Sequence, residues 1–155
     1  MNLALYHPQI PQNTGTLLRL VSCLGIHLDI IHPCGFIFSD KKLKRSGMDY
    51  IELAAYKIHN SFQQFCESYA DRRLVALDVG DNSVPHYDFE YESNDILLVG
   101  SEHYGFLDDD LKTIKHRIKI PMLPQRRSMN MAIAAAMVLS TAISKTNSWP
   151  LLTSP

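Results

Sequence analysis

Residues 2–25 read NLALYHPQIPQNTGTLLRLVSCLG and contain the signals for a β-strand, a loop and an α-helix in succession. The run Leu3–Tyr6 is short and continuously apolar, as expected for a strand that is buried on both faces. Apolar residues then recur at helical spacing, which predicts a helix over Thr14–Leu24 that ends at Gly25. The stretch therefore predicts one strand–helix unit of a parallel sheet.

The same alternation of apolar runs and helical patterns continues along the chain and is typical of an α/β fold with a mostly parallel sheet. Further strands are predicted at Leu28–Ile31, Leu74–Leu77, Ile96–Val99 and Ile118–Ile120, with a weaker one near Ile51–Ala54. Helices are predicted at Asp40–Ser46, Phe62–Tyr69 and Met129–Ser144, with Ser39, Ser61 and Ser128 as N-caps. We expect a single domain over residues 1–146 and a tail over 147–155.

The composition is that of an ordinary globular protein, with 46% hydrophobic and 20% charged residues among 155. No apolar run reaches the roughly 18 residues that a membrane helix needs, and the start of the chain lacks the basic flank of a signal peptide. Cys23, Cys34 and Cys66 have no metal-ligand spacing, so we expect reduced thiols. A cytoplasmic protein is the expectation.

Charge is unevenly distributed, although the net charge is only −1. Between Leu74 and Leu111 the sequence has no lysine or arginine. The basic residues that flank this acidic stretch are Lys41, Lys42, Lys44 and Arg45 on one side, and Lys112, Lys115, Arg117, Lys119, Arg126 and Arg127 on the other. Each group fits an ordinary solvated face, but the separation of charge also permits a phosphate-binding face.

Three loops could carry chemistry, and each follows a predicted buried strand, where ligands gather in parallel sheets. In the first, His7–Gly15, either Asn13 or Thr14 is predicted to cap the following helix, whose N-terminal amides suit an anionic group such as phosphate. Arg19 lies about one turn into that helix and can reach back over the same opening. Taken alone, the segment also fits a plain loop followed by a surface arginine.

The second and third loops have the features of a ligand pocket. Gly100 at a strand end allows a ligand to approach the backbone, and Glu102 could cap amides or hold a ligand hydroxyl. Ile120 and Met122 can sandwich an adenine. Ser128 and Asn130 place polar groups at the start of the last helix, where Ser128 is also expected to be the cap.

Together and in this order, these segments resemble the SPOUT class of RNA methyltransferases. The resemblance is strongest to its minimal single-domain branch, the tRNA (cytidine/uridine-34)-2′-O-methyltransferases, and runs from Asn2 to about Ile143. The segments that carry it are Pro8–Gly15 with Arg19, Leu43–Tyr50, Gly100–Glu102, and Ile120–Met122 leading to Arg127–Asn130. The chain differs from the family pattern at Ala132-Ile133, where members commonly have Ser-Asn.

The resemblance implies a parallel-sheet SPOUT fold with a C-terminal deep trefoil knot, and a homodimer. It also implies that S-adenosylmethionine is the methyl donor and that no metal is needed. The cofactor-binding residues implied are Leu77, Gly100, Glu102, Ile120, Met122, Ser128 and Asn130. Arg19, reaching over from the partner subunit, would orient the ribose 2′-hydroxyl and phosphate. Asn13, Arg45 and Arg127 would bind the substrate, the anticodon stem-loop of a leucine tRNA.

Two alternatives remain open at this point. The same enzyme could methylate another position of tRNA or of rRNA. A SPOUT protein that binds RNA without catalysis is the other alternative, and the Ala132-Ile133 difference is its only support in the sequence.

Overall fold

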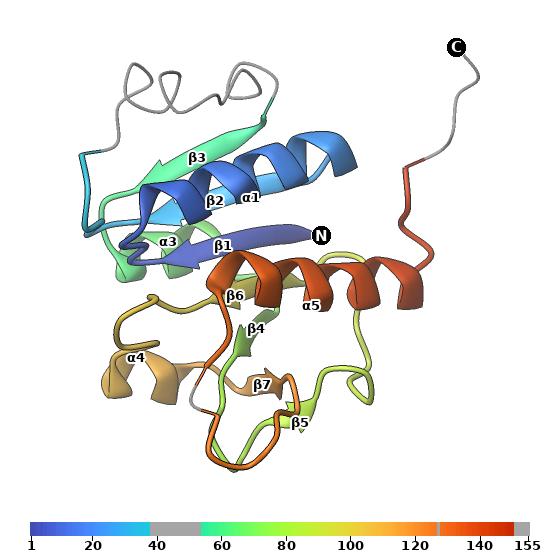
Figure 1. Cartoon of the computed structure of the whole chain (residues 1–155). Coiled ribbons are helices and arrows are strands. Elements are labelled where there is room, and N and C mark those ends of the chain that lie inside the picture. The colour runs from blue at the N-terminus through green and yellow to red at the C-terminus, as the bar shows by residue number, and fades with distance from the viewer. Residues whose placement is uncertain (38–53, 127, 151–155) are drawn as a thin grey trace.

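The computed structural model describes residues 1–37, 54–126 and 128–150. In this part of the chain, parallel strands form one sheet in the order β3-β2-β1-β6-β4-β7-β5 (Figure 1). The strands are β1 (Asn2–Tyr6), β2 (His27–Ile31), β3 (Tyr56–His59), β4 (Leu74–Leu77), β5 (Val84–Pro85), β6 (Ile96–Val99) and β7 (His116–Lys119). The helices are α1 (Pro11–Leu24), α3 (Phe62–Ser68), α4 (Asp108–Thr113) and α5 (Met131–Lys145).

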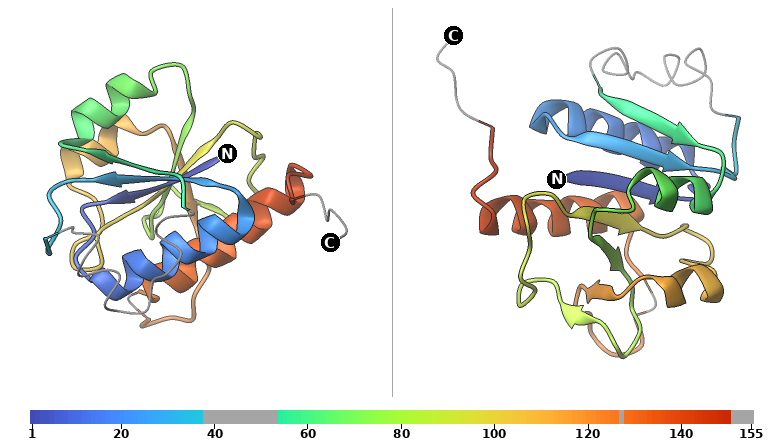
Figure 2. Two further views of the ribbon diagram at one scale, coloured as in Figure 1. Left: turned by 90° about the horizontal axis from the view of Figure 1, so that it is seen from above. Right: turned by 180° about the vertical axis from the view of Figure 1, so that it is seen from behind.

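Helices cover both faces of the sheet. Figure 2 shows α1 and α5 side by side on one face and α3 and α4 on the other. The side chains of β1 alternate accordingly: Leu3 and Leu5 pack in the core under α1 and α5, whereas Ala4 and Tyr6 belong to the core under α3 and α4. β4 and β6, which are covered on both faces, consist of apolar residues only, and the predicted α/β class is confirmed.

The predicted strands of the sheet centre are confirmed. β4 and β6 coincide with the predicted ranges, and β1 and β2 each begin one residue earlier than predicted. β7 begins two residues before the predicted start at Ile118 and ends one residue before the predicted end at Ile120. Its start is set by pairing with β4, in which Val75 pairs with His116 and Leu77 with Ile118. Pairing with a neighbour, rather than local apolarity, sets these limits.

The predicted helix starts were partly wrong. α1 begins at Pro11, so Asn13 and Thr14 lie inside its first turn and do not cap it. α5 begins at Met131 with Asn130 as its N-cap instead of Ser128. The Ser61 cap of α3 is confirmed, as is the end of α1 at Gly25, whose φ of 65° is the left-handed conformation typical of a C-cap.

Three short elements were not predicted: β3, β5 and α4. The helix expected at Asp40–Ser46 lies outside the described residues, as does most of the strand expected near Ile51–Ala54. Within the described ranges, no helix has the length and apolarity that crossing a bilayer requires.

Candidate active site

A cleft of about 590 Å³ lies at the carboxyl edge of the sheet. The strands β1, β6, β4 and β7 are parallel neighbours, so the loops that follow them meet at this edge. The cleft is lined by Leu77, Asp78, Val79, Val99, Gly100, Ser101, Glu102, His103, Tyr104, Gly105, Phe106, Asp108, Leu111, Ile120, Met122, Ser128, Met129, Met131 and Ala134. Loops far apart in the sequence therefore build one cavity of the size that a nucleotide-like ligand needs.

Six of the seven residues predicted to bind the cofactor line this cleft: Leu77, Gly100, Glu102, Ile120, Met122 and Ser128. The seventh, Asn130, does not line it and instead caps α5. Ile120 and Met122 both contribute apolar surface to the wall that follows β7. The structure thus brings together the residues that the second and third loops were expected to supply.

The loop after β6 is a closed turn. The Ser101 amide donates to the Gly105 carbonyl and the Gly105 amide donates to the Ser101 carbonyl, both at 2.8 Å. A Cβ on Gly100 would lie 2.8 Å from the carbonyl carbon of Gly105. Gly100 is therefore required by the turn itself, because the space for a side chain there is filled by backbone rather than left open for a ligand.

Glu102 joins the turn after β6 to the first loop. Its carboxylate accepts hydrogen bonds from the Gln9 amide at 2.7 Å and the Ile10 amide at 3.1 Å. It also accepts one from the Asn13 side-chain amide at 3.0 Å. The positive end of the α1 dipole stabilises the negative charge of Glu102 at this position. Glu102 thus fixes, from another loop, the residues that lead into α1, while Ile10 at the N-cap position provides no side-chain cap.

Asn13 continues the connection to the third loop. The Asn130 side-chain amide donates to Asn13 Oδ1 at 3.0 Å. Asn130 Oδ1 in turn accepts from the amides of Ala132 and Ile133 at 2.9 and 3.2 Å. We refer to these three side chains, Glu102, Asn13 and Asn130, as the asparagine bridge. It ties the starts of α1 and α5 to the turn after β6, and the Ala132-Ile133 difference leaves the Asn130 cap of α5 intact.

The residues predicted to act on the substrate do not line the cleft where the structure describes them. Arg19 lies on the exposed side of α1, about two turns after Pro11, and is not among the residues that line the cleft. Asn13 is buried within the asparagine bridge. Arg45 and Arg127 lie outside the described residues.

Two of the basic residues that flank the acidic stretch are occupied within the protein. The Arg117 guanidinium donates to the Leu111 carbonyl at 2.8 Å, and the Lys112 ammonium lies 2.9 Å from an oxygen of Asp109. These contacts fit the structural interpretation of the second basic group better than a phosphate-binding one.

The sequence prediction missed several residues of the cleft, of which Asp78, Tyr104 and Asp108 are the most informative. Asp78 directly follows β4, so the rule that ligands bind at the carboxyl ends of strands could have found it. Asp78, Asp108 and Glu102 give the cleft an acidic lining, which suits a ligand with positive charge. For Tyr104 the sequence offered no signal beyond its place in a functional loop.

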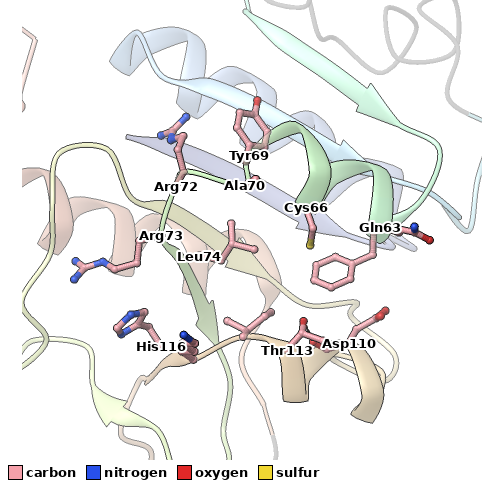
Figure 3. Close-up of a pocket in the computed structure, with 13 residues that line it drawn as sticks. Gln63, Cys66, Tyr69, Ala70, Arg72, Arg73, Leu74, Asp110, Thr113 and His116 are labelled. Carbon is pink, nitrogen blue, oxygen red and sulfur yellow. Dashed lines mark hydrogen bonds between the residues drawn. The ribbon is translucent and has the colours of Figure 1, made fainter.

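A second cavity, of about 580 Å³, lies between α3 and α4, on the face of the sheet that these two helices cover (Figure 3). Arg72 and Arg73 lie at one end of it and Cys66 toward the other. Arg73 is paired with Asp95 at 2.7 Å and with Glu92 at 2.9 Å. This cavity contains none of the predicted site residues, so the cleft at the carboxyl edge is the stronger candidate.

A parallel sheet with an acidic, partly apolar cleft among the loops of its carboxyl edge defines an α/β enzyme that binds a nucleotide-like ligand. Residues 1–140 match the SpoU rRNA Methylase family, and the chain belongs to that family. The resemblance to RNA methyltransferases noted in the sequence is thereby confirmed.

Individual relatives support this assignment. A tRNA (cytidine(34)-2′-O)-methyltransferase of Beijerinckia indica subsp. indica is 46% identical over 91% of this chain and 89% of the relative. A solved structure concerned with 2-OH methylation of C/U34 on tRNA superposes with a TM-score of 0.85 at 34% identity, over 93% of this chain and 94% of that one. An AdoMet-bound rRNA methyltransferase from Sinorhizobium meliloti shares the fold, with a TM-score of 0.81 at 22% identity over 92% of this chain and 55% of its own.

Proposed function

We propose that this chain transfers a methyl group from S-adenosylmethionine to the ribose 2′-hydroxyl of the wobble nucleotide of tRNA. The observation that carries the proposal is the cleft at the carboxyl edge, where the end of β4 and the loops after β6 and β7 of a SpoU-family chain place six expected cofactor residues together. Relatives that are up to 46% identical to this chain, over about nine-tenths of its length, are named for this reaction at nucleotide 34.

The cleft fits S-adenosylmethionine in both shape and charge. Leu77, Ile120 and Met122 offer apolar surface for the adenine, and the carboxylates of Asp78 and Asp108 suit the positive charges of the cofactor. When bound, S-adenosylmethionine supplies a methyl group on a positively charged sulfur, which is a good leaving group. The protein's task is then largely to exclude water and align the acceptor.

Arg19 is proposed as the residue that acts on the acceptor. A guanidinium does not lose its proton in proteins, so its role is to orient the ribose and phosphate and to stabilise charge as the 2′-oxygen attacks. Because Arg19 does not line the cleft of its own chain, we infer that it serves the cleft of a partner subunit. Asn13 supports this arrangement indirectly, by fixing the start of the helix that carries Arg19.

The proposed assembly is a homodimer built on α1 and α5. Ile133 and Met137 on α5 are 55% and 40% exposed, and neighbouring Met129 and Ile10 are also exposed. Such a group of apolar side chains beside a packed helix pair is typical of a protein interface. A second chain placed there would bring its own α1, and therefore its own Arg19, close to this cleft.

We infer further features of this chain from its family. The chain is expected to form a deep trefoil knot around the turn after β6 and the loop before α5. This is supported by the position of Met131 and Ala134, which bring the start of α5 into the same cleft as that turn. We also propose that residues 1–146 form one domain, that Arg45 and Arg127 bind the anticodon stem-loop of leucine tRNAs, and that the enzyme works in the cytoplasm.

Radiolabelled methyl transfer followed by nucleoside mapping tests the proposal. The purified protein is incubated with labelled S-adenosylmethionine and tRNA from a strain that lacks this modification. We expect label on the ribose of the wobble nucleotide, and no label on a tRNA whose wobble ribose is 2′-deoxy. Label at another nucleotide, or undiminished labelling of the deoxy substrate, would refute the assignment.

A further inference from the structure

Tyr104 lies at the tip of the turn after β6, where it lines the cleft and is 47% exposed. Its hydroxyl is not free, because it lies 2.9 Å from Nδ1 of His7 in the first loop. Since the hydroxyl is engaged with a buried partner, we attribute much of the exposed surface of Tyr104 to its ring. A flat aromatic surface is thus presented at the cleft.

His7 is itself held firmly. It is only 6% exposed, its ring stacks on Tyr6 with centroids 3.8 Å apart, and its amide donates to the Ile31 carbonyl at 3.0 Å. Its φ of 47° lies in the left-handed region, which a residue other than glycine adopts only when its surroundings require it. The fold therefore maintains an unfavourable backbone conformation at the residue that contacts Tyr104.

We propose that the Tyr104 ring is a stacking platform for the base of the nucleotide that is methylated, and that His7 is the positioning residue that fixes this ring. The inference rests on the proposed function, because it requires the acceptor ribose to lie at this cleft. The base is attached to the ribose carbon next to the one that bears the 2′-hydroxyl. A ribose placed beside the cofactor thus brings its base to the rim where Tyr104 lies.

Stacking on an aromatic side chain is a common way to hold an unpaired base of RNA. Every base has a flat face, so the platform contributes to binding without selecting among bases. The anchored hydroxyl reduces the conformational freedom that the ring would lose when RNA binds. Tyr104 thus acts on the affinity for the acceptor, whereas Arg19 acts on the transfer step.

The test is a double-mutant cycle, in which removal of the tyrosine ring is combined with removal of the base. The dissociation constant for tRNA is measured by fluorescence anisotropy with saturating S-adenosylhomocysteine, for intact tRNA and for tRNA with an abasic wobble nucleotide. We expect Tyr104→Leu to weaken binding of intact tRNA about tenfold, or about 1.4 kcal/mol, and to leave binding of the abasic tRNA unchanged. Tyr104→Phe, which keeps the ring, should lose about threefold or less.

Two further variants separate stacking from a general effect on structure. His7→Asn tolerates the positive φ but cannot hold the ring, so it should weaken binding of intact tRNA in the wild-type background and have no effect in the Tyr104→Leu background. Tyr87 is also exposed, at 52%, but does not line the cleft, so Tyr87→Leu is the matched control and should bind both RNAs normally.

The inference is overturned if Tyr104→Leu weakens binding of intact and abasic tRNA equally, or if Tyr104→Phe is as impaired as Tyr104→Leu. It is also overturned if the penalty disappears only when a neighbouring nucleotide is made abasic. These outcomes are distinct from failure of the proposed function. A wild-type protein that methylates the wobble ribose but shows no ring–base coupling retains the function and loses the platform.

Discussion

Arg19, which we propose acts on the acceptor ribose, lies outside the cleft proposed for the cofactor. Because it does not line the cleft, Arg19→Ala should leave the dissociation constant for S-adenosylmethionine unchanged within about twofold, while single-turnover methyl transfer falls at least about a hundredfold. Arg19→Lys keeps the charge but not the planar fork, so it should recover only part of the rate. Calorimetry and single-turnover assays measure the two effects. Loss of cofactor binding in Arg19→Ala would instead indicate a structural role.

Glu102 has a different kind of importance, since its carboxylate satisfies three donors of the first loop. Glu102→Gln replaces one acceptor oxygen with a donor that faces other donors, so we expect the free energy of unfolding to fall by about 1–3 kcal/mol. Urea denaturation measures this change. Glu92→Gln is the control, because that carboxylate is 58% exposed in its pair with Arg73 and should cost less than about 1 kcal/mol. Equal losses in the two variants would contradict the role of Glu102 in holding the first loop.

The pKa values of two buried histidines indicate how the free energy of unfolding depends on pH. Burial lowers the pKa of His7 and that of His86, with Lys145 adding to the effect at His86. A histidine whose pKa is lower in the folded protein favours folding most above the unfolded value of about 6.5, and this contribution is lost as the pH falls. Urea denaturation from pH 7.5 to 5.5 should therefore show a decline that is smaller in His7→Asn. An identical decline in both proteins would mean that His7 does not titrate with folding.

The site residues show what sequence can predict at this scale. Gly100 and Ile120 could be assigned because each directly follows a strand, and Met122 because it lies two residues after Ile120 in the same loop. The roles of Asn13 and Asn130 could not, because these residues are 117 positions apart and their hydrogen bond exists only once the sheet has brought α1 and α5 together. Local rules therefore predicted a helix cap at Asn13 or Thr14, whereas in the structure the Asn13 side chain donates to Glu102 and accepts from Asn130.

Among the elements, predictability followed burial. The ranges of β4 and β6 could be read directly, because strands buried on both faces are continuously apolar. β5 spans two residues and is defined by its pairing with β7, so no local pattern marks it. α4 begins with three aspartates and has no buried residue, which is why hydrophobic periodicity did not reveal it.

The start of α5 can be tested as an element. Asn130 does two things there: its oxygen caps the helix and its amide donates to Asn13. Asn130→Ala loses both and should cost about 2 kcal/mol or more. Asn130→Asp keeps the cap but opposes an oxygen of Asn13, so its loss should be smaller, while methyl transfer is impaired in both. Urea denaturation and transfer assays give these values, and wild-type transfer by Asn130→Asp would argue against a catalytic need for the asparagine bridge.

For the whole molecule, the main question is how Arg19 and the cleft come together. The exposed apolar side chains of α5 lie beside α1, so pairing of two copies through this face would bury them and move each Arg19 toward the other chain. A symmetric dimer repeats every contact twice, so one such interface would complete two active sites. In this proposed geometry, a single chain would contain the cleft but would lack the arginine that acts on the acceptor.

Complementation between two inactive variants tests this arrangement. Arg19→Ala has an intact cleft, whereas Gly100→Ala keeps Arg19 but forces a Cβ against the backbone of Gly105 and should not bind the cofactor. If Arg19 acts across the dimer, each mixed dimer contains one site in which both are intact, and an equal mixture re-equilibrated from denaturant should regain about a quarter of wild-type activity. Methyl transfer to tRNA is the measurement, with each variant refolded alone as the control. If Arg19 serves its own chain, no mixed site is complete, and the mixture should stay as inactive as its components.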